Sequence, residues 1–368
     1  MKYYIIAGEA SGDLHGSNLI KALHAKDPQA TIQCWGGEAM EAAGATLRKH
    51  YKDLAFMGFV EVLFHLKTIL RNLSFCKEDI LQFQPDVLVL IDYPGFNMRI
   101  ATWAKQQGIK VVYYISPQVW AWKEKRVHSL KATVDKLLVI LPFEIAYFKQ
   151  WNFEVDYVGH PLIEVITEAK QKGKGTALST KPIIALLPGS RKQEIAAKLP
   201  IMLSLVPLFP EYQFVIAQAP SMDADFYKTW MPSEGVLLVP NRTYDIVQQA
   251  AAAIVTSGTA TLETALFGVP QLVCYKGNPI SFWLAKRFVK IKFIALANLI
   301  MNRSIVPELI QDDLNTKNLQ GHLQKLLMDE HTQQQLQADY AELWTALGSK
   351  NASDAAADAV LSMAQQAH

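Results

Sequence analysis

The sequence has no marked excess of charge of either sign, since 368 residues carry a net charge of only +2. A balance so close to neutrality argues against a nucleic-acid-binding protein. Cysteines are few and scattered (Cys34, Cys76 and Cys274), and their spacing matches no metal-binding motif. An odd number of widely separated cysteines favours a reduced compartment, so we expect a cytoplasmic protein.

Long hydrophobic runs are also absent. No apolar run approaches the roughly 18–20 residues that cross a bilayer. The first run follows Lys2 and is soon interrupted by Glu9 and Asp13, so we expect no signal peptide. Half of the residues are hydrophobic, which is typical of a well-packed globular protein. We therefore expect a soluble protein, and binding at a membrane surface stays compatible with this composition.

Apolar runs that alternate with helix-like patterns predict the fold. Several runs are continuously apolar, which is typical of parallel strands covered by helices on both faces. The predicted strands cover residues 2–7, 31–35, 86–92, 110–115, 136–141 and 155–158, and then 182–187, 212–217, 235–240, 251–256 and 269–275.

These two sets of strands predict two α/β domains. We expect two Rossmann-like, doubly wound domains facing a cleft, with ligands at the carboxyl ends of the strands. The predicted domains cover residues 1–168 and 182–345, joined by a polar linker at 169–181. A final helix at 346–368 could pack on the first domain or on a second copy of the chain, which would make a homodimer.

Two loops of the second domain are suited to bind a nucleotide. Each follows a predicted strand and precedes a predicted helix, whose first backbone amides can bind a diphosphate. Glu263, one turn into the second helix, is placed to accept hydrogen bonds from a ribose diol. Ordinary turns capped by Ser and Thr are the alternative for both loops. The loops consist of Gly189, Ser190 and Arg191, and of Ser257, Gly258 and Thr259.

The loop that follows the first strand has a different character. Its glycines are spaced four apart, which fits neither the dinucleotide fingerprint nor the Walker A pattern. Its carboxylates would repel a diphosphate, so we predict that it binds the hydroxyl groups of a sugar. The helix N-cap is the alternative role for Ser11 and Asp13. The predicted binding residues are Glu9, Ser11 and Asp13.

Several motifs together resemble the lipid-A-disaccharide synthase family. They are GEASGDLHG, SPQVWAWKEKRV, PFE, VGHPL, LPGSRKQEI, SGTATLE and the segment from FWLAKRFVK to NRSIVPELIQ, within residues 3–311. The resemblance implies a two-domain glycosyltransferase of the GT-B type. Such an enzyme transfers 2,3-diacylglucosamine from UDP to 2,3-diacylglucosamine 1-phosphate. The implied products are UDP and the β-1,6-linked disaccharide 1-phosphate, formed with inversion.

The resemblance further implies an enzyme without metal or other cofactor, peripheral at the cytoplasmic face of the inner membrane. One motif departs from the family pattern. Residues 91–97 read IDYPGFN, with Gly95 where the family has a second acid, so no role of that acid is transferred. Asp92 and Asn97 match the family pattern and are assigned to the acceptor side.

Inverting transfer needs a base for the acceptor hydroxyl and a positive potential for the departing UDP. Asp92 ends a predicted buried strand and is the candidate base, whereas ordering the turn at Pro94 is its alternative role. Arg191 is the candidate that stabilises UDP. The resemblance adds Asn298, Arg303, Glu308 and Gln311 on the donor side, with a helix-start carboxylate as the alternative for Glu308. Candidates for the acceptor phosphate are Lys123, Lys125 and Arg126.

The segment at 56–72 has a helical pattern with an apolar core stripe and a mixed flank. This flank interleaves apolar and cationic side chains, which suits an anionic membrane surface. A basic and aromatic stretch at 282–293 has a similar composition. For both, a helix between sheet and solvent is the alternative. The predicted membrane residues are Val60, Phe64, Lys67 and Arg71.

Two rival functions remain open at this point. The first is another GT-B enzyme that acts on UDP-GlcNAc-type substrates, such as a UDP-sugar epimerase. It would explain the nucleotide loops but not the basic, aromatic stretches. The second is a non-catalytic membrane-surface protein, which Asp92, Arg191 and Glu263 argue against.

Overall fold

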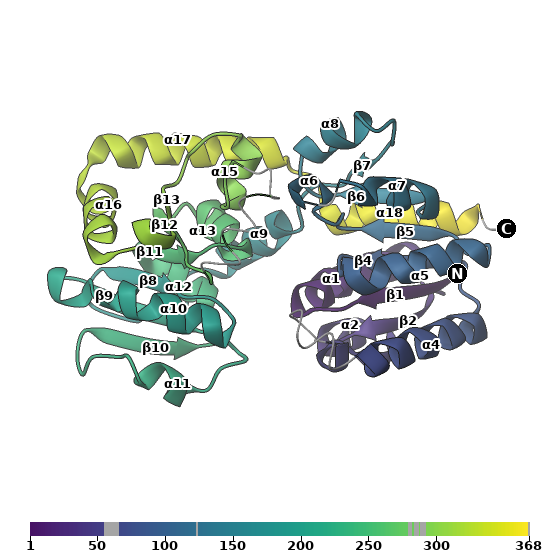
Figure 1. The fold of residues 1–368 in the computed structure, drawn as a ribbon, viewed down its shortest axis with the longest axis horizontal. Coiled ribbons are helices and arrows are strands. Elements are labelled where there is room, and N and C mark those ends of the chain that lie inside the picture. Colours follow the sequence, from purple (N-terminus) through teal and green to yellow (C-terminus); the bar gives the residue numbers. More distant parts are fainter. Residues whose placement is uncertain (55–65, 123, 279–281, 283–286, 288–291, 367–368) are drawn as a thin grey trace. The chain divides into compact units, whose positions relative to one another are not determined.

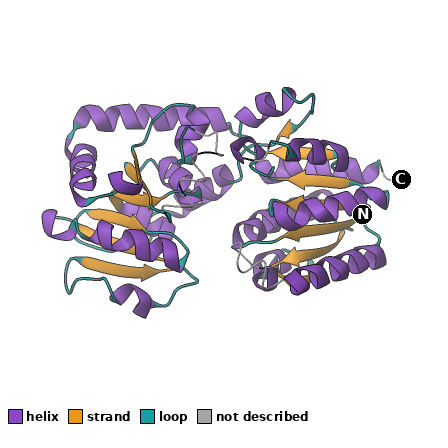
Figure 2. Cartoon of the chain, in the orientation of Figure 1, coloured by secondary structure: helices purple, strands orange, loops and turns teal. Residues whose placement is uncertain are grey.

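The computed structural model describes residues 1–54, 66–122, 124–278, 282, 287 and 292–366. These residues form two compact units (Figure 1). The first unit consists of Met1–Pro161 and Ser349–His368, and the second of Leu162–Gly348. Each unit contains a parallel sheet with helices against it (Figure 2).

The sheet of the first unit has the strand order β3-β2-β1-β4-β5-β6-β7, and every neighbouring pair is parallel. Its central strands are fully buried because apolar residues on alternate sides contact helices on both faces. The strands are β1 (Lys2–Ala7), β2 (Thr31–Gly36), β3 (Thr46–His50), β4 (Val87–Ile91), β5 (Val111–Tyr114), β6 (Lys136–Val139) and β7 (Asp156–Tyr157).

Successive side chains of β1 point to opposite faces of the sheet, so they belong to two separate hydrophobic clusters. Ile5 packs with helices α1 and α18, whereas Tyr4 and Ile6 pack with α4, α5 and α7. Helix α18, yellow in Figure 1, lies near the end of the chain but belongs to the first unit, where it packs along α1. The helices are α1 (Ala10–Lys26), α2 (Glu38–Ala42), η1 (Tyr51–Leu54), α4 (Leu66–Phe83), α5 (Pro94–Gln106), α6 (Val119–Trp122), α7 (Arg126–Thr133), α8 (Phe143–Lys149) and α18 (Ala352–Gln365).

The sheet of the second unit has the parallel order β10-β9-β8-β11-β12-β13. Its strands are β8 (Ile183–Leu187), β9 (Gln213–Gln218), β10 (Val236–Pro240), β11 (Ala250–Thr256), β12 (Gln271–Tyr275) and β13 (Glu308–Ile310). Its helices are α9 (Leu162–Lys172), α10 (Lys192–Leu203), η2 (Val206–Leu208), α11 (Ala224–Lys228), α12 (Thr243–Gln249), α13 (Thr259–Phe267), α15 (Leu296–Met301), η3 (Gln311–Asp313), α16 (Thr316–Met328) and α17 (Glu330–Leu347).

The expected fold class is confirmed, since the chain forms two doubly wound parallel α/β units. The boundary between the units differs from the expected one, because it falls after Pro161 and not within 169–181. Residues 162–172 form α9, whose Ile166 is buried in the core of the second unit. Two short strands, β3 and β13, were not among the predicted strands.

In each sheet, strand order reverses between two central neighbours. Ala7 at the end of β1 pairs with Ile91 at the end of β4, and Leu187 of β8 pairs with Val255 of β11. The loops that follow these strands therefore emerge side by side, at the positions where open α/β sheets bind ligands. The loops at Gly189 and Ser257, and those at Glu9 and Asp92, follow these strands.

Candidate functional site

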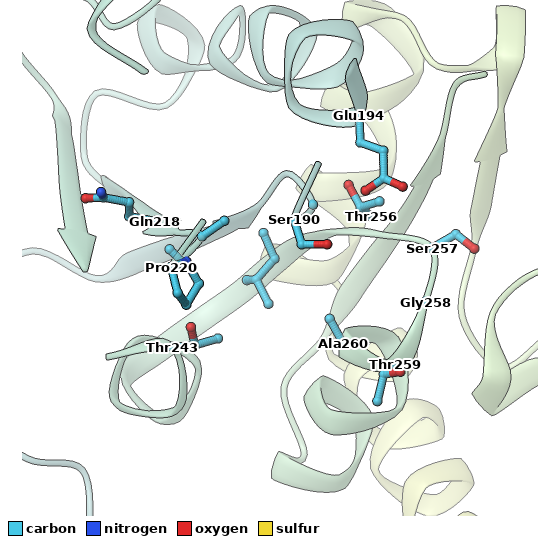
Figure 3. Close-up of a pocket in the computed structure, with 14 residues that line it drawn as sticks. Ser190, Glu194, Gln218, Pro220, Thr243, Thr256, Ser257, Gly258, Thr259 and Ala260 are labelled. Carbon is cyan, nitrogen blue, oxygen red and sulfur yellow. The ribbon is translucent and has the colours of Figure 1, made fainter. Parts of the chain in front are cut away.

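A pocket of about 300 Å³ opens at the switch point of the second unit (Figure 3). Both predicted nucleotide loops line it, one after β8 and the other after β11. The structure thus brings together residues that lie about 70 positions apart in the sequence. The predicted residues in its wall are Gly189, Ser190, Ser257, Gly258 and Thr259.

Glycines shape both loops of this nucleotide pocket. Gly189 and Gly258 have φ angles of +117° and +142°, which residues with a side chain rarely adopt. A Cβ atom on Gly189 would lie 2.7 Å from Oε2 of Glu194. Among the described residues, no atom beyond the chain neighbours of Gly258 lies within 4 Å of its Cβ position, so backbone conformation alone favours glycine there.

Two helices begin at the pocket without side-chain caps. Helix α10 follows Arg191 and helix α13 follows Gly258, and neither N-cap residue makes a side-chain capping bond. The capping alternative is therefore wrong for both loops. In the described part of the chain, no side chain accepts a hydrogen bond from the first amides of these helices, so an anion can bind there, where the helix dipole also favours negative charge.

Side chains around the pocket add polar groups that the sequence did not single out. Figure 3 shows the Glu194 carboxylate close to Thr256, whose buried hydroxyl has no partner among the described residues. Arg191 is not part of the described lining, and its guanidinium contacts Glu194 at 3.3 Å. Lys198 is buried, and burial lowers its pKa while Glu194 opposes that shift.

Glu263 lines a neighbouring pocket of about 480 Å³ instead. Its carboxylate accepts a hydrogen bond of 2.7 Å from the Tyr244 hydroxyl, and burial raises its pKa. Thr243 lines both pockets, so they adjoin. The predicted ribose site at Glu263 therefore adjoins the loops that are predicted to bind the diphosphate. A ribose attached to a bound diphosphate requires such an adjoining site.

The other donor-side candidates are engaged with the protein. Buried Asn298 donates to the carbonyl of Val306 and to Glu308, both at 2.8 Å. Glu308 also accepts hydrogen bonds from the backbone amides of Ile294 and Ala295, just before α15. Glu308 itself begins strand β13, so its alternative role as a helix-start carboxylate is wrong, and its assignment to the donor stays a prediction.

Gln311 and Arg303 are likewise held by neighbours. The Gln311 side chain accepts from the amide of Gly277 at 2.8 Å. Arg303 forms ion pairs with Asp339 at 2.8 Å and Glu342 at 2.5 Å. These contacts position both residues, and their assignment to the donor stays a prediction.

Asp92 lies at the switch point of the first unit, directly after β4. Asp92 and Tyr93 both have left-handed backbones, with φ angles of 43° and 49°. Such conformations cost free energy in residues with a side chain and are common at functional sites. The Asp92 carbonyl accepts hydrogen bonds from Asn97 Nδ2 at 2.8 Å and from the Tyr113 hydroxyl at 2.6 Å. Asn97 Nδ2 also donates to Ile91 at 3.1 Å.

The environment of Asp92 favours its protonated form. Burial raises the pKa of Asp92 to about 6, and the negative charge of Glu9 contributes to the shift. Glu9 precedes α1 in the neighbouring loop and is half-buried. A carboxyl group with a pKa close to neutrality is suited to accept a proton in catalysis.

Close packing brings the two loops of this site together. A Cβ atom on Gly8 would lie 2.3 Å from the ring of Tyr93, so only glycine allows this contact. Helix α1 begins at Ala10 after Glu9, so neither Ser11 nor Asp13 is its N-cap residue. Asp13 instead accepts hydrogen bonds from the amides of Gly37, Ala39 and Met40 at 2.7–3.1 Å.

The buried Asp13 carboxylate therefore binds the backbone amides at the start of α2. Ser11 is exposed on the first turn of α1. Its role in binding a sugar stays a prediction, as does that of Glu9.

The basic candidates for the acceptor phosphate lie around α6 and α7. Lys123 is outside the described residues, Lys125 is exposed, and Arg126 begins α7. Arg126 is an electrostatic neighbour of Tyr113, which places it near the Asp92 site. Glu144 of the PFE motif is buried, accepts from the amide of Leu141 and has its pKa raised to about 7 by burial.

The membrane candidates are only partly described. Val60 and Phe64 lie outside the described residues, whereas Lys67 and Arg71 are exposed on α4. None of the described helices is long and apolar enough to cross a membrane. Nowhere in the described part of the chain do three His, Cys, Asp or Glu side chains gather as metal ligands.

Comparisons of structure identify the fold. A UDP-GlcNAc 2-epimerase from Neisseria meningitidis superposes with a TM-score of 0.72 at 13% identity, covering 98% of this chain and 100% of that one. The glycosyltransferase of kitacinnamycin gives a TM-score of 0.68 at 14% identity, covering 98% of both chains. At such low identity these similarities establish the fold alone.

Comparisons of sequence identify the family. The lipid-A-disaccharide synthase of Trichlorobacter lovleyi is 38% identical over 374 residues, which cover 98% of this chain and 97% of the relative. Lipid-A-disaccharide synthase 1 of Legionella pneumophila subsp. pneumophila is 37% identical, covering 95% and 94%. The model of the lipid-A-disaccharide synthetase family matches residues 3–363. The chain therefore belongs to the lipid-A-disaccharide synthetase family and is a glycosyltransferase.

Proposed function

We propose that the chain transfers 2,3-diacylglucosamine from UDP to the 6-hydroxyl of 2,3-diacylglucosamine 1-phosphate, with inversion. One observation carries the proposal beyond family membership: two uncapped helix N-termini meet in one pocket of the second unit. Such helix ends bind phosphate groups through free amides and the helix dipole. The UDP diphosphate is assigned to this pocket, and its ribose to the neighbouring pocket at Glu263.

Departure of UDP leaves negative charge on the diphosphate, which the protein must stabilise. The amides that begin α10 and α13 are fixed in place before the reaction, so they need no reorganisation as charge develops. Arg191 adds a positive charge that is now shared with Glu194. We propose that the Arg191 guanidinium turns from Glu194 to the diphosphate when UDP-sugar binds.

The acceptor is assigned to the first unit, with Asp92 as general base. The carboxylate of Asp92 would remove the proton from the 6-hydroxyl as the oxygen attacks the anomeric carbon of the donor. With a pKa of about 6, Asp92 is ionised at neutral pH and retains useful basicity. Glu9 and Ser11 are assigned to sugar hydroxyls, and Arg126, with Lys123, to the acceptor phosphate.

We also propose that the enzyme acts at the cytoplasmic face of the inner membrane, where acylated sugars reside. One observation supports this assignment, since Lys67 and Arg71 are exposed on α4. Cations near a surface attract anionic lipids by about 1 kcal/mol each.

The identity of the product tests the proposed function. The purified chain is incubated with UDP-2,3-diacylglucosamine and 2,3-diacylglucosamine 1-phosphate in detergent, and lipids are analysed by mass spectrometry and proton NMR. We expect UDP and a disaccharide with a β anomeric linkage. Consumption of UDP-GlcNAc without any acylated acceptor would instead support an epimerase, and UDP binding without turnover a non-catalytic protein.

A further inference from the structure

Glu144 is a buried carboxyl group that takes no part in the proposed mechanism. It lies in the first turn of α8 and is only 1% exposed. Its Oε2 accepts a hydrogen bond from the amide of Leu141 at 2.9 Å. Burial of a carboxyl group costs free energy unless hydrogen bonds compensate for the lost water. The contacts of Glu144 therefore indicate what it does in the first unit.

Two loops meet at this carboxyl group. Residues 115–122 form the segment after β5, which ends in α6, and its side chains Ser116 and Trp120 interact with Glu144. Two backbone amides of the loop after β6 are further partners, and all four interactions lower the pKa that burial raises. Trp120 also packs edge-on against Phe143, with 5.0 Å between the ring centroids. Its buried Nε1 completes no hydrogen bond with any described residue, so its attraction to Glu144 is electrostatic.

The 115–122 segment begins in a strained conformation. Ile115 has a φ angle of 64°, although branching at its Cβ disfavours the left-handed region. Such conformations persist only where the surrounding structure holds them, and they are common at functional sites. Within the segment, the Ser116 hydroxyl and the Val119 amide both donate to the carbonyl of Pro117, at 3.1 and 2.6 Å. The contacts with Glu144 add a connection from this segment to α8.

The 115–122 segment lies beside the Asp92 loop and leads to a basic residue. Strands β4, β5 and β6 are neighbours in the sheet, so the loops at their carboxyl ends adjoin. The amide of Asp92 donates to the carbonyl of Tyr114 at 3.1 Å, one residue before the segment begins. Arg126 begins α7 four residues after the segment ends and is an electrostatic neighbour of Tyr113. Because a chain spans at most about 3.6 Å per residue, the position of the segment limits where Arg126 can lie.

We propose that Glu144 is a positioning residue for recognition of the acceptor phosphate. Through Ser116 and Trp120 it holds the 115–122 segment, and the segment in turn fixes the position of Arg126. Glu144 itself is too buried to contact the substrate. This inference rests on the proposed assignment of Arg126 to the acceptor phosphate and deepens it, since it names the group that holds this arginine in place. It requires neither the nucleotide pocket nor a particular general base.

The test compares two acceptors that differ only in the phosphate. Rates of disaccharide formation by the full chain are measured in detergent at saturating donor, with 2,3-diacylglucosamine 1-phosphate or 2,3-diacylglucosamine as acceptor. Binding of each acceptor is measured by isothermal titration, so the comparison does not depend on turnover. For Glu144→Ala we expect KM and Kd of the phosphorylated acceptor to rise about tenfold, as for one lost hydrogen bond to a charged group. Values for the unphosphorylated acceptor should change by less than about twofold, because it lacks the group that Arg126 recognises.

Further variants separate positioning from folding. Glu144→Gln keeps an oxygen for the loop amides and a donor for Ser116, so KM of the phosphorylated acceptor should stay within about threefold of wild type. Ser116→Ala removes one hydroxyl beside the carboxyl group and should raise this KM about threefold. Arg126→Gln should raise it about tenfold, and adding Glu144→Ala should then change little, since both act on one contact. Glu154→Ala removes an exposed carboxylate between α8 and β7 and is the matched control, with no expected effect. Circular dichroism melts check the fold of each variant.

Equal losses with both acceptors in Glu144→Ala would overturn the inference, because the carboxyl group would then serve only the fold. Fully additive losses in the double variant would also overturn it, since Glu144 would then act independently of Arg126. If Glu144→Ala does not fold, the same comparison of acceptors with Ser116→Ala decides. Disaccharide synthesis with unchanged selectivity in Glu144→Ala would reject the positioning role and leave the proposed function intact. Selective loss of binding of the phosphorylated acceptor in a protein that forms no disaccharide would do the reverse.

Discussion

Removal of a single hydroxyl group tests how the backbone of Asp92 is held. The Tyr113 hydroxyl donates to the Asp92 carbonyl at 2.6 Å and comes from the adjacent strand β5. The pKa of Tyr113 lies well above its usual range because of burial and the nearby Asp92, so the hydroxyl stays a donor at all working pH values. Tyr113→Phe removes this donor and leaves the ring in place.

The expected magnitude follows from the contacts of this carbonyl. The left-handed conformations of Asp92 and Tyr93 each cost on the order of 1–3 kcal/mol. Hydrogen bonds from Tyr113 and Asn97 help to offset that cost. Loss of one such bond removes about 1 kcal/mol of stabilisation from this backbone conformation. The Asp92 carboxylate should then occupy its productive position less often, and kcat should fall about fivefold. Asn97→Ala removes bonds to both Ile91 and Asp92, and we expect a larger fall.

The assay compares kcat and KM of wild type and Tyr113→Phe in detergent, with the UDP affinity of each measured separately. We expect kcat to fall while UDP affinity is unchanged, because the nucleotide pocket belongs to the other unit. Tyr157→Phe is a matched control, since it removes a hydroxyl from β7, the edge strand of the same sheet. A Tyr113→Phe protein with lower thermal stability but unchanged kcat would show that the hydroxyl serves only the fold and does not position Asp92.

Three further predictions concern charges. Arg191→Ala should slow turnover by about a hundredfold or more, since loss of one donor to a developing oxyanion costs on the order of 2.7–4 kcal/mol; a loss under threefold in steady-state assays contradicts the assigned role. For Asp92, with a pKa of about 6, kcat/KM should fall as pH drops below 6, because the base becomes protonated. Glu9→Gln removes the negative neighbour that raises this pKa, so the acid limb of the pH profile should move to lower pH; an unmoved limb would exclude Asp92 as the group that titrates. The pKa of buried Glu144 rises from 4.5 to about 7, so the folded state keeps a proton that the unfolded chain releases, and stability falls as pH rises through this range. Glu144→Gln should therefore raise Tm at pH 8 and flatten its pH dependence, as differential scanning calorimetry would measure; a lower Tm at pH 8 would contradict this.

The sequence predicts the central strands well because burial on both faces leaves an unmistakable pattern. Strands β1 and β4 are continuous apolar runs whose residues are all or nearly all buried. Strand β3 reads TLRKH and lies at the edge of its sheet, where polar residues can face solvent. Its sequence therefore lacks the apolar pattern that predicts a strand. Strand β13 has only three residues, too few for a period to emerge.

The helix α9 was missed for a different reason. Its last turn is rich in lysine and is followed by Gly173 and Gly175, both of which have positive φ angles. Composition there resembles a linker, although the apolar face of the helix is buried in the second unit. Local composition cannot reveal which unit such a helix joins.

The sequence predicts which loops form the candidate sites but not the side-chain contacts within them. The convergence of the Gly189 and Ser257 loops follows from strand order, which doubly wound folds make predictable. By contrast, the engagement of Asp13 with α2 and of Tyr113 with Asp92 depends on side chains from distant segments. Buried Lys198 lies four positions after Glu194 on α10, so helix spacing predicts that pair, whereas nothing local to it indicates its proximity to Cys274.

Asp92→Asn removes the proposed general base while keeping the size of the side chain. Wild type and Asp92→Asn are compared in the disaccharide assay with EDTA, and UDP binding is titrated for both. We expect disaccharide from the wild type, a loss of at least about a hundredfold in the variant, as for removal of a general base, and equal UDP affinity. Near-normal turnover by Asp92→Asn would contradict the assignment and would require another group to accept the proton.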